Sequence, residues 1–482
     1  MHTTAVASTL RLAIVGSGPS GFYAAARVLG AFDPARGSGA GGVAVHMFEQ
    51  LPAPFGLVRY GVAPDHPEVR NAENRFDQVA RDPRFRFFGN VCVADEPRAA
   101  PHISLATLSQ HYTHLLLAYG ASEPRTLDIP GARLGHSLAA LDFVEWYNGH
   151  PRAFAPGGIA ESLARVRGER MRHVTVIGAG NVALDVARVL LRATKHAPAG
   201  ALAHTDMPQP VLDTLRTWHV EHVSVCARRG PAQAAFTNKE LREMLALHAP
   251  MRPLAPALLA DAQRALPADA GQRRALARLL AQLEKGSTAA TWTPEARPQW
   301  ALEFLRAPAA FLGNGGGVSG VRWDVTRLDG ARAVPTGAQI ETPADMVVAS
   351  VGYKSEPLRG ARIPFDPRRR VVPNTHGRVD GCPGVYASGW VATGPVGIIA
   401  TTMMGAFGVA DEIVADWRHG QPTLCGGAPD DALARGLDSP GVISYADWLE
   451  IDAAERRRGA QLGKPREKFL HVDDMLRVLR RI

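Results

Sequence analysis

Short apolar runs that end in glycine recur along this chain, and the first lies close to its N-terminus. Residues 12–15 are apolar, the glycine-rich segment 16–21 follows at once, and the alanine-rich stretch 22–29 comes next. Because alanine and leucine are good helix formers, we predict a helix over that stretch, and the apolar run 43–48 predicts a second strand. Strand, turn, helix and strand in this order form the βαβ unit of a parallel sheet.

The same pattern returns in the middle of the chain. Residues 173–177 predict a strand, 178–183 a turn, 184–191 a helix and 222–227 a further strand. Two such units predict two doubly wound α/β domains.

Two more apolar strands, 115–120 and 346–352, bracket the second unit. We interpret them as the chain leaving the first domain and returning to it. The predicted fold is therefore α/β with two dinucleotide-binding domains, the second inserted into a discontinuous first. The predicted boundaries are 1–120 and 354–482 for the first domain and 121–353 for the second.

Other segments carry weaker signals. The stretch 254–284 is rich in Ala, Leu, Arg and Gln and predicts helix. The tail from Ser444 predicts a pair of surface helices that pack through one apolar face, which comprises Trp448, Leu449, Ile451, Val472, Met475, Leu476 and Leu479. Residues 36–42 predict a flexible glycine-rich loop. Residues 1–11 contain hydroxyl side chains, one arginine and no acid, which fits either a short organellar transit segment or a disordered lead-in.

The first glycine-rich turn has the spacing of a dinucleotide-binding loop. Gly16 permits a tight turn, Gly18 lets a pyrophosphate approach the backbone, and Gly21 lets the helix pack on the strand. The N-terminus of the helix offers unpaired N–H groups to the phosphates. Glu49, at the end of the second strand, is placed to accept a hydrogen bond from a ribose 2′-OH.

The second turn ends differently, because Ala183 replaces the last glycine and no acid follows the second strand. Arg228 and Arg229 stand there instead. Guanidinium groups suit a 2′-phosphate, so we predict NADPH rather than NADH at this loop. The alternative is an arginine pair on a solvated loop of a basic chain.

Composition narrows the function classes. The chain has 482 residues, 46% of them apolar and 21% charged, with a net charge of +8. No apolar run reaches the ~20 residues that a membrane helix needs. The positive charge is either a solubilising surface or a face for an acidic partner, and no nucleic-acid recognition module accompanies it. The four cysteines form no C-x-x-C pair and no metal-binding spacing, so we expect free thiols and no metal site.

Long blocks of the sequence resemble the family of adrenodoxin reductases and mycobacterial-type ferredoxin–NADP reductases. The matching blocks follow one another in the order of the family: 16–23, 54–67, 82–91, 182–188, 228–231, 235–243, 389–390 and 394–400. The resemblance implies an enzyme with two Rossmann-like domains. It would take hydride from NADPH through FAD and pass electrons singly to a small acidic [2Fe-2S] protein of the ferredoxin or adrenodoxin type.

The resemblance also implies roles for individual residues. FAD would contact Gly16, Gly18, Ser20, Gly21, Glu49, Leu57, Val91, Trp390, Gly397, Ile398 and Ile399. NADP would contact Gly178, Gly180, Asn181, Arg228 and Arg229, with Glu240 nearby.

A proton and orientation network is expected from His66, Asp185 and Glu240, which lie in blocks that reach the active site of the family. Each has a plainer alternative. His66 would rigidify a turn between prolines, Asp185 would pair with Arg188, and Glu240 would be a solvated helix residue.

The partner surface shows one departure from the family. A basic pair often precedes Gly-Pro-Thr-Gly in the family, and here Ala392 and Thr393 stand before Gly394. This leaves the docking face for the acceptor open. Lys239 and Arg242 are candidates for contact with an acidic partner. We expect a monomer, located in the mitochondrial matrix if the source is eukaryotic and otherwise in the cytoplasm.

Three other functions compete with this one. A disulfide reductase is disfavoured because the dithiol motif is missing. A flavin monooxygenase would also use two nucleotide sites, and a non-catalytic NADP-binding regulator would need only one. The resemblance does not choose the physiological acceptor.

Overall fold

The computed structural model describes residues 9–33, 42–95, 101–198, 200–288, 292–313, 316–360, 362–424, 437 and 439–481. Residues 1–8, most of the predicted 36–42 loop and Cys425 lie outside these ranges. Among the residues within them, no helix has the length and apolar character needed to span a membrane.

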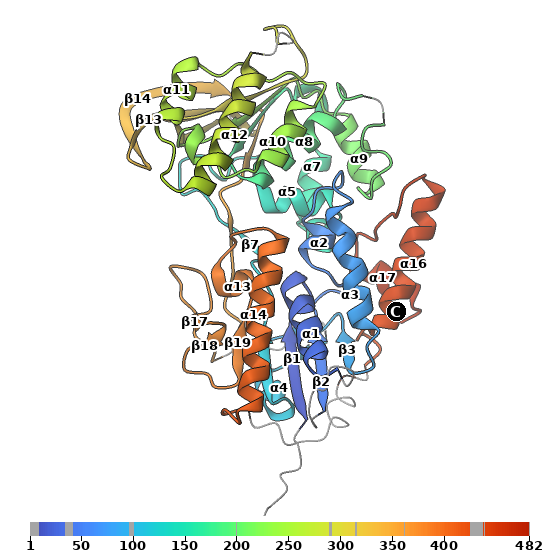
Figure 1. Cartoon of the computed structure of the whole chain (residues 1–482). Coiled ribbons are helices and arrows are strands. Elements are labelled where there is room, and N and C mark those ends of the chain that lie inside the picture. The colour runs from blue at the N-terminus through green and yellow to red at the C-terminus, as the bar shows by residue number, and fades with distance from the viewer. Residues whose placement is uncertain are drawn as a thin grey trace, which may run out of the picture.

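A seven-stranded sheet forms the centre of the first domain, the lower body in Figure 1. Its strand order is β17-β18-β19-β6-β1-β2-β3, and the run from β19 to β3 is parallel. The strands are β1 (Leu10–Val15), β2 (Val43–Phe48), β3 (Phe85–Phe88), β6 (His114–Leu117), β17 (Asn374–Thr375), β18 (Arg378–Val379) and β19 (Val385–Ala387). Nearly all side chains of β1 are buried, as expected of a parallel strand covered on both faces.

Helices from both ends of the chain cover this sheet. In particular, α14 packs along α1 (Figure 1). The helices of this domain are α1 (Pro19–Ala31), α2 (Leu57–Tyr60), α3 (Ala72–Ala80), α4 (Leu105–His111), α13 (Trp390–Thr393), α14 (Ile399–Arg418), α16 (Tyr445–Gln461) and α17 (Val472–Val478), with the 3-10 turn η2 (Val69–Asn71). A small parallel pair, β4 (Cys92–Val93) and β5 (His102–Ile103), lies beside them.

The second domain is built on a five-stranded parallel sheet of order β11-β10-β9-β15-β8. These strands are β8 (Ser137–Ala139), β9 (His173–Ile177), β10 (His222–Cys226), β11 (Gln299–Glu303) and β15 (Met346–Ala349). Its helices are α5 (Ala140–Tyr147), α6 (Pro151–Phe154), α7 (Ile159–Ala164), α8 (Asn181–Ala193), α9 (Gln209–Arg216), α10 (Asn238–Leu245), α11 (Pro256–Arg264) and α12 (Ala270–Ser287), with the turns η3 (Gly168–Arg170) and η4 (Pro231–Gln233).

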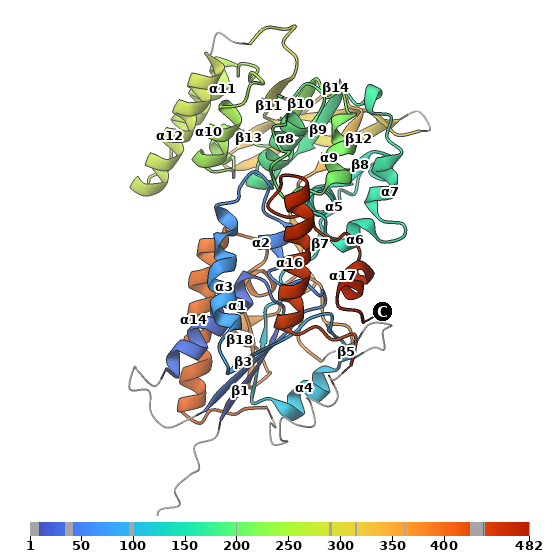
Figure 2. The same cartoon turned by 90° about the vertical axis from the view of Figure 1, so that its right-hand side faces the viewer.

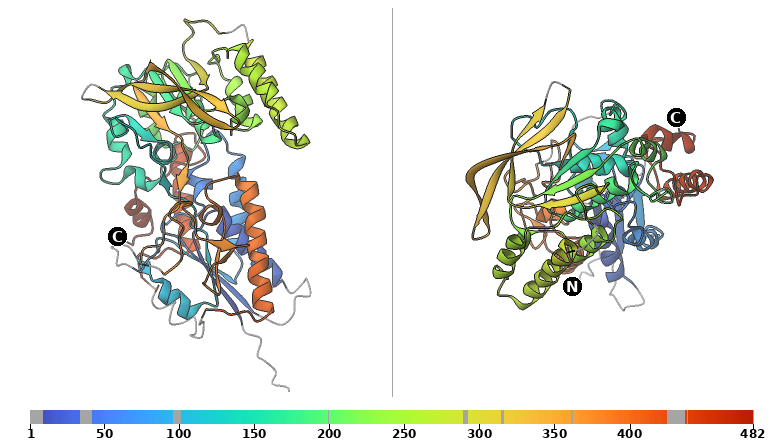
Figure 3. Two further views of the ribbon diagram at one scale, coloured as in Figure 1. Left: turned by 90° about the vertical axis from the view of Figure 1, so that its left-hand side faces the viewer. Right: turned by 90° about the horizontal axis from the view of Figure 1, so that it is seen from above.

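A three-stranded antiparallel sheet packs against the five-stranded one (Figure 3). It consists of β12 (Arg306–Gly313), β13 (Val318–Asp329) and β14 (Arg332–Pro343). Trp323 and Val321 of β13 share one buried cluster with Ile177 and Cys226, so this sheet closes the face of the parallel sheet.

The chain passes from the first sheet to the second after β6 and returns after β15. The two passages pair as short antiparallel strands, β7 (Glu123–Pro124) and β16 (Tyr353–Lys354). The structure therefore confirms the predicted insertion of one α/β domain into the other. The strands β6 and β15 end at 117 and 349, earlier than predicted, because the chain turns toward the linkers at Gly120 (φ +74°) and Gly352 (φ +98°).

The C-terminal tail forms the two predicted helices, α16 and α17 (Figure 2). Ser444 caps α16, and Asp447 completes the capping box. The prediction of a helix pair that packs through one apolar face is confirmed, since Trp448 and Ile451 of α16 are buried while Glu450 and residues 456–458 are exposed. The burial of Glu455 on the same face was not predicted.

Candidate functional site

The first glycine loop, between β1 and α1, leaves open space at its centre. Gly16 has φ +103°, and a Cβ there would lie 2.6 Å from the carbonyl oxygen of Ala118. A Cβ on Gly21 would lie 2.4 Å from the carbonyl oxygen of Gly16. A Cβ on Gly18 would meet no atom within 4 Å. Two glycines are thus demanded by packing, whereas Gly18 faces the space in which a pyrophosphate fits, at the N-terminus of α1.

Glu49 stands beside this loop at the end of β2. Its Oε2 accepts hydrogen bonds from the backbone N–H of Ser17 at 3.1 Å and from Ser17 Oγ at 2.7 Å. Burial raises the pKa of Glu49, and the hydrogen bonds from Ser17 oppose that shift. Ser17 was not singled out from the sequence, although its place between two loop glycines is the available signal.

Segments far apart in sequence meet around the same loop. The hydroxyls of Ser20 and Ser388 are 2.8 Å apart. Gly389 has φ +70°, and a Cβ there would lie 2.8 Å from Cβ of Ser20. The close approach holds Trp390, the first residue of α13, near the first loop. The ring of Trp390 lies 5.7 Å from that of Tyr353 in the linker.

Two further predicted flavin contacts border this region. Leu57 begins α2, and a Cβ on the preceding Gly56 would lie 3.2 Å from Cα of Gly18. Val91 is buried, and its N–H donates to the carbonyl oxygen of Glu49 at 2.8 Å. The contact of Gly56 with the first loop therefore fixes the position of Leu57, and the hydrogen bond to Glu49 fixes that of Val91.

The segment before α14 presents exposed backbone and apolar side chains. Gly397 has φ +92°, Ile399 begins α14, and the N–H of Ile398 donates to Thr401 Oγ1 at 2.9 Å. Ile398 and Val396 are 54% and 76% exposed, which is unusual for large aliphatic side chains. An aromatic ring system stacked here would cover apolar surface.

The second loop repeats the geometry of the first. Gly178 has φ +133°, and a Cβ there would lie 2.2 Å from the carbonyl oxygen of Ser350. A Cβ on Gly180 would meet no atom within 4 Å. Asn181 begins α8, and its Oδ1 accepts from the N–H of Thr237 at 2.9 Å. A second pyrophosphate therefore fits at the N-terminus of α8.

Arg228 and Arg229 follow β10. Hydrogen bonds hold the backbone of both residues, and their side chains are exposed. Thr326 Oγ1 donates to the carbonyl oxygen of Arg228 at 2.7 Å, and the N–H of Leu305 donates to that of Arg229 at 3.2 Å. The loop is fixed while both guanidinium groups face solvent, which suits recognition of a phosphate at the strand end.

His66 lies between carboxylates of both domains. Its Nδ1 is 3.0 Å from Glu68 Oε1 in the first domain, and its Nε2 is 3.0 Å from Glu243 Oε2 on α10 of the second. His66 is 8% exposed and lines a cavity of about 530 Å³, together with Arg188 and Glu243. A histidine held in this way can pass a proton between two acids and the water of the cavity.

Asp185 belongs to the same group of charges. Its carboxylate lies 2.8 Å from Arg188, which also holds Asp65 at 2.7 Å. Burial raises the pKa of Asp185, and the Arg188 guanidinium opposes that shift. Asp185 thus pairs with Arg188, as the plainer interpretation of the sequence predicts, and it also lies near His66.

Glu240 is placed differently. It accepts a hydrogen bond from the hydroxyl of Thr237, next to Asn181, and Glu243 rather than Glu240 contacts His66. Both glutamates lie on α10, three residues apart, and sequence spacing cannot decide which one faces the histidine.

Comparison with known proteins gives one consistent answer. The profile of the pyridine nucleotide-disulphide oxidoreductase family matches residues 10–246. The chain is 40% identical to the mitochondrial NADPH:adrenodoxin oxidoreductase of Bos taurus, over 99% of this chain and 94% of that protein. It is 39% identical to the NADPH-ferredoxin reductase FprA of Mycobacterium leprae, over 97% and 98% of the two chains. A solved structure of Mycobacterium tuberculosis FprA in complex with NADPH superposes with a TM-score of 0.86 at 35% identity, covering 98% and 99%.

This chain belongs to the NADPH:adrenodoxin oxidoreductase family.

Two of the described cysteines, Cys226 and Cys382, are free thiols. Cys226 is buried in the second domain, and burial raises the pKa of its thiol to about 12. A thiol of this kind is unreactive.

Proposed function

We propose that this protein is an FAD-dependent NADPH:ferredoxin reductase of the adrenodoxin reductase type. It takes hydride from NADPH and delivers electrons singly to a small iron–sulfur protein. The observation that carries the proposal is the pair of open glycine loops, one with Glu49 and the other with Arg228 and Arg229 at the strand end. Residues 1–120 and 354–482 would form the FAD domain, and residues 121–353 the NADP domain.

The open loops support one nucleotide site in each domain. FAD, when bound, supplies the group that accepts hydride, so the protein needs no nucleophile of its own. The residues proposed to hold FAD are Gly16, Gly18, Ser20, Gly21, Glu49, Leu57, Val91, Trp390, Gly397, Ile398 and Ile399. Those proposed to hold NADP are Gly178, Gly180, Asn181, Arg228 and Arg229.

Proton movement is proposed for the charges around His66. Oxidation of one NADPH by two one-electron acceptors releases one proton. His66 can hold that proton between Glu243 and Glu68, and the side chain of Glu68 is 53% exposed to solvent. Asp185 lies within this group, whereas Glu240, bonded to Thr237 beside the second loop, is proposed to orient the nicotinamide nucleotide.

The acceptor is proposed to be an acidic ferredoxin- or adrenodoxin-type protein. Lys239 and Arg242 on α10 are exposed. The side-chain amide of Asn238 donates to the carbonyl oxygen of Ala275 at 3.2 Å, which places α10 beside α12. The exposed arginines that α12 adds to this surface are Arg273, Arg274 and Arg278. A basic surface of this kind steers an acidic partner toward the crevice between the domains.

Location and assembly are also proposals. The bovine relative is named as a mitochondrial protein, whereas another relative comes from a bacterium. We therefore place this protein in the mitochondrial matrix if its source is eukaryotic and in the cytoplasm otherwise. We propose that it acts as a monomer.

One set of assays tests the proposed function. The purified protein should be yellow, should bleach when NADPH is added, and should reduce cytochrome c faster when a ferredoxin is present. Replacing Arg228 and Arg229 by Ala should raise KM for NADPH on the order of 10- to 100-fold, because charged hydrogen bonds to the 2′-phosphate are lost. KM for NADH should change little, and Arg165→Ala, at the exposed arginine that directly follows α7, is the control.

Other outcomes would point to the competing functions. Equal effects on NADPH and NADH would contradict the arginine assignment. Oxygen consumption that does not depend on any iron–sulfur protein would favour a monooxygenase, and a colourless protein would favour a non-catalytic NADP-binding regulator.

A further inference from the structure

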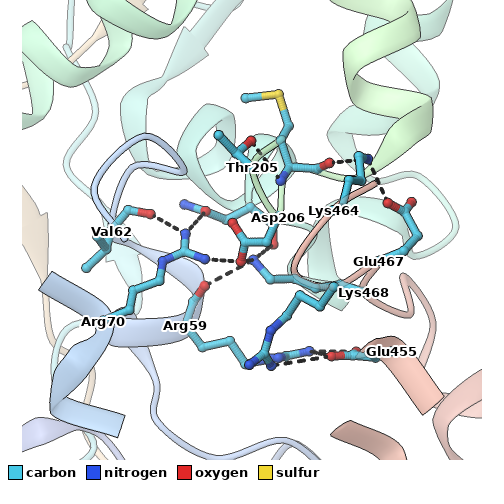
Figure 4. A network of polar contacts seen from close by, with 12 residues as sticks. Arg59, Val62, Arg70, Thr205, Asp206, Glu455, Lys464, Glu467 and Lys468 are labelled. Atoms are coloured by element: carbon cyan, nitrogen blue, oxygen red, sulfur yellow. Dashed lines mark hydrogen bonds and ion pairs between the residues drawn. The ribbon is translucent and has the colours of Figure 1, made fainter. Parts of the chain in front are cut away.

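Residues 464–469, which follow α16 and are called the strap here, lie between the two domains (Figures 2 and 4). The chain itself passes between the domains at β7 and β16. In Figure 1, β7 lies at the left of the region where the two domains meet, and the tail helices α16 and α17 lie at the right. The strap therefore joins the domains away from the linkers.

The strap forms hydrogen bonds with the loop that precedes α9 and with the start of α9 in the second domain. Lys464 Nζ donates to the carbonyl oxygen of Met207 at 2.8 Å and lies 2.8 Å from Glu467 Oε2. The other oxygen of Glu467 accepts from the N–H of Gln209, the first residue of α9, also at 2.8 Å. The side chains of Lys464 and Glu467 are 1% and 6% exposed, so this contact is shielded from solvent.

Lys468 makes the central contact. Its Nζ lies 2.8 Å from Asp206 Oδ2 and donates to the carbonyl oxygen of Asn148 at 2.9 Å. Arg70, on the turn η2 of the first domain, contacts the same oxygen of Asp206. Burial and the neighbouring Arg70 lower the pKa of Lys468 well below its usual range. A carboxylate and carbonyl oxygens surround the amine and pair its hydrogen-bonding groups.

The other side of the strap is anchored to the first domain. Arg59 Nη2 of α2 donates to both carboxylate oxygens of Glu455 of α16, at 2.7 and 2.8 Å, and Glu455 Oε1 also accepts from the N–H of Phe469 at 3.0 Å. Lys468 donates to the carbonyl oxygen of Arg59 at 3.3 Å. Because α2 follows Gly56, which packs against Gly18, this path of buried contacts leads from the second domain to the first glycine loop.

We propose that Lys464, Glu467 and Lys468 are positioning residues that hold the NADP domain in one orientation relative to the FAD domain. The inference rests on the proposed function, since the two nucleotides must meet at a fixed distance and angle for hydride transfer. A misplacement of about 1 Å can slow such a reaction on the order of 100-fold. The strap touches neither glycine loop directly, so it acts through domain orientation.

Other interdomain contacts use groups of the proton network. Arg188 pairs with Asp65, and His66 with Glu243. These contacts will still hold part of the interface when the strap is altered. The expected effect of the strap is therefore smaller than that of a full misplacement.

The test uses full-length, FAD-loaded protein with Lys468→Met, which keeps the length of the side chain but removes the amine. In stopped flow at saturating NADPH, we expect flavin bleaching to be about tenfold slower. The FAD content should be unchanged, and the half-saturating NADPH concentration should stay within about twofold, because the α8 loop and Arg228 and Arg229 are intact. Arg477→Met, at a 62% exposed side chain on α17, is the matched control and should behave as wild type.

A second measurement does not depend on activity. Hydrogen exchange over residues 205–209 should become about tenfold faster in Lys468→Met and in Glu467→Gln, because the strap no longer restrains that loop. Glu467→Gln keeps the shape of the side chain and replaces Lys468→Met in the stopped-flow test if the latter does not retain FAD.

The outcomes separate the two proposals. A wild-type protein that NADPH does not bleach would overturn the proposed function. A wild type that is bleached, together with variants that have wild-type rates at saturating NADPH, would overturn the positioning role. If the bleaching rate of a variant falls only in proportion to its loss of bound FAD, the strap has a structural role. That result would also overturn the positioning role.

Discussion

At the level of single residues, the histidine between the domains carries the most specific expectation. His66 belongs to the first domain, yet one of its two acidic partners, Glu243, comes from the second. The contacts of the proposed proton network therefore form only when the domains are correctly arranged. The same loop of the first domain also carries Asp65, which pairs with Arg188 and Arg192 of α8.

We predict that His66→Ala slows reoxidation of the NADPH-reduced flavin by ferredoxin about tenfold or more while FAD stays bound, because that half-reaction releases the proton and acid–base groups commonly contribute on the order of 100-fold. Glu243→Gln should change the rate in the same direction, because it removes the charge beside Nε2. Stopped-flow absorbance measures the rate, and Glu284→Gln on the exposed face of α12 is the control. An unchanged rate in both variants would remove this pair from the mechanism.

The sequence allowed some residue assignments and not others. The loop glycines, Glu49 and the arginine pair occupy fixed positions relative to predicted strands, so their geometry follows from the βαβ unit. Glu243 and Ser17 could not be selected in this way. Their roles depend on the rotation of α10 and on the side-chain conformation within a turn, which the pattern of apolar positions does not determine.

At the level of elements, the first two glycines of one loop have similar conformations and surroundings to the first two glycines of the other. In each, the first glycine has a positive φ and no room for a Cβ, and the second faces open space. The first position therefore belongs to folding and the second to ligand binding.

We predict that Gly180→Ala leaves the melting temperature within about 2 °C of wild type but raises KM for NADPH about tenfold, because the methyl group occupies the space of the pyrophosphate. Gly178→Ala is the contrasting variant. Its Cβ would lie 2.2 Å from a carbonyl oxygen, so it should lower the melting temperature measurably. Thermal melts and steady-state kinetics on the same samples distinguish the two effects, and equal melting temperatures for the two variants would contradict this division.

The order and type of most elements were predictable because apolar runs and glycine turns alternate along the chain. The apolar side of α16 was also predictable, but the burial of Glu455 on that side was not. Glu455 is buried because Arg59, nearly 400 residues earlier, neutralises it. Pairings over such distances leave no local pattern in the sequence.

At the level of the whole molecule, the two domains present surfaces of different chemistry. The NADP domain presents the basic surface of α10 and α12. On the FAD side, Ala392 is buried, and the exposed side chains near the start of α14 include Val396, Ile398 and Met404. The family's basic pair is replaced here by uncharged residues, so we place the salt-sensitive part of docking on the NADP domain.

We predict that the double variant Arg274→Glu and Arg278→Glu raises KM for an acidic ferredoxin about tenfold at low salt, and that the difference shrinks at high salt as the charges are screened. Reduction of ferricyanide by NADPH should not change. The matched control reverses Arg368 and Arg369, an exposed pair in the first domain. A KM for ferredoxin that responds equally to both double variants would indicate a general charge effect rather than a docking surface.

The interrupted first domain also sets the order in which the molecule can be assembled during synthesis. Strand β19 pairs with β6, and α14 packs on α1, so residues 9–117 lack these partners until the whole second domain has left the ribosome. The second domain is continuous in sequence and is free to fold during that interval. Capture of the flavin is then among the last events of biogenesis. A chain whose translation stops early would carry a site for NADPH and no completed site for FAD, and it would draw no electrons from the cell's NADPH pool.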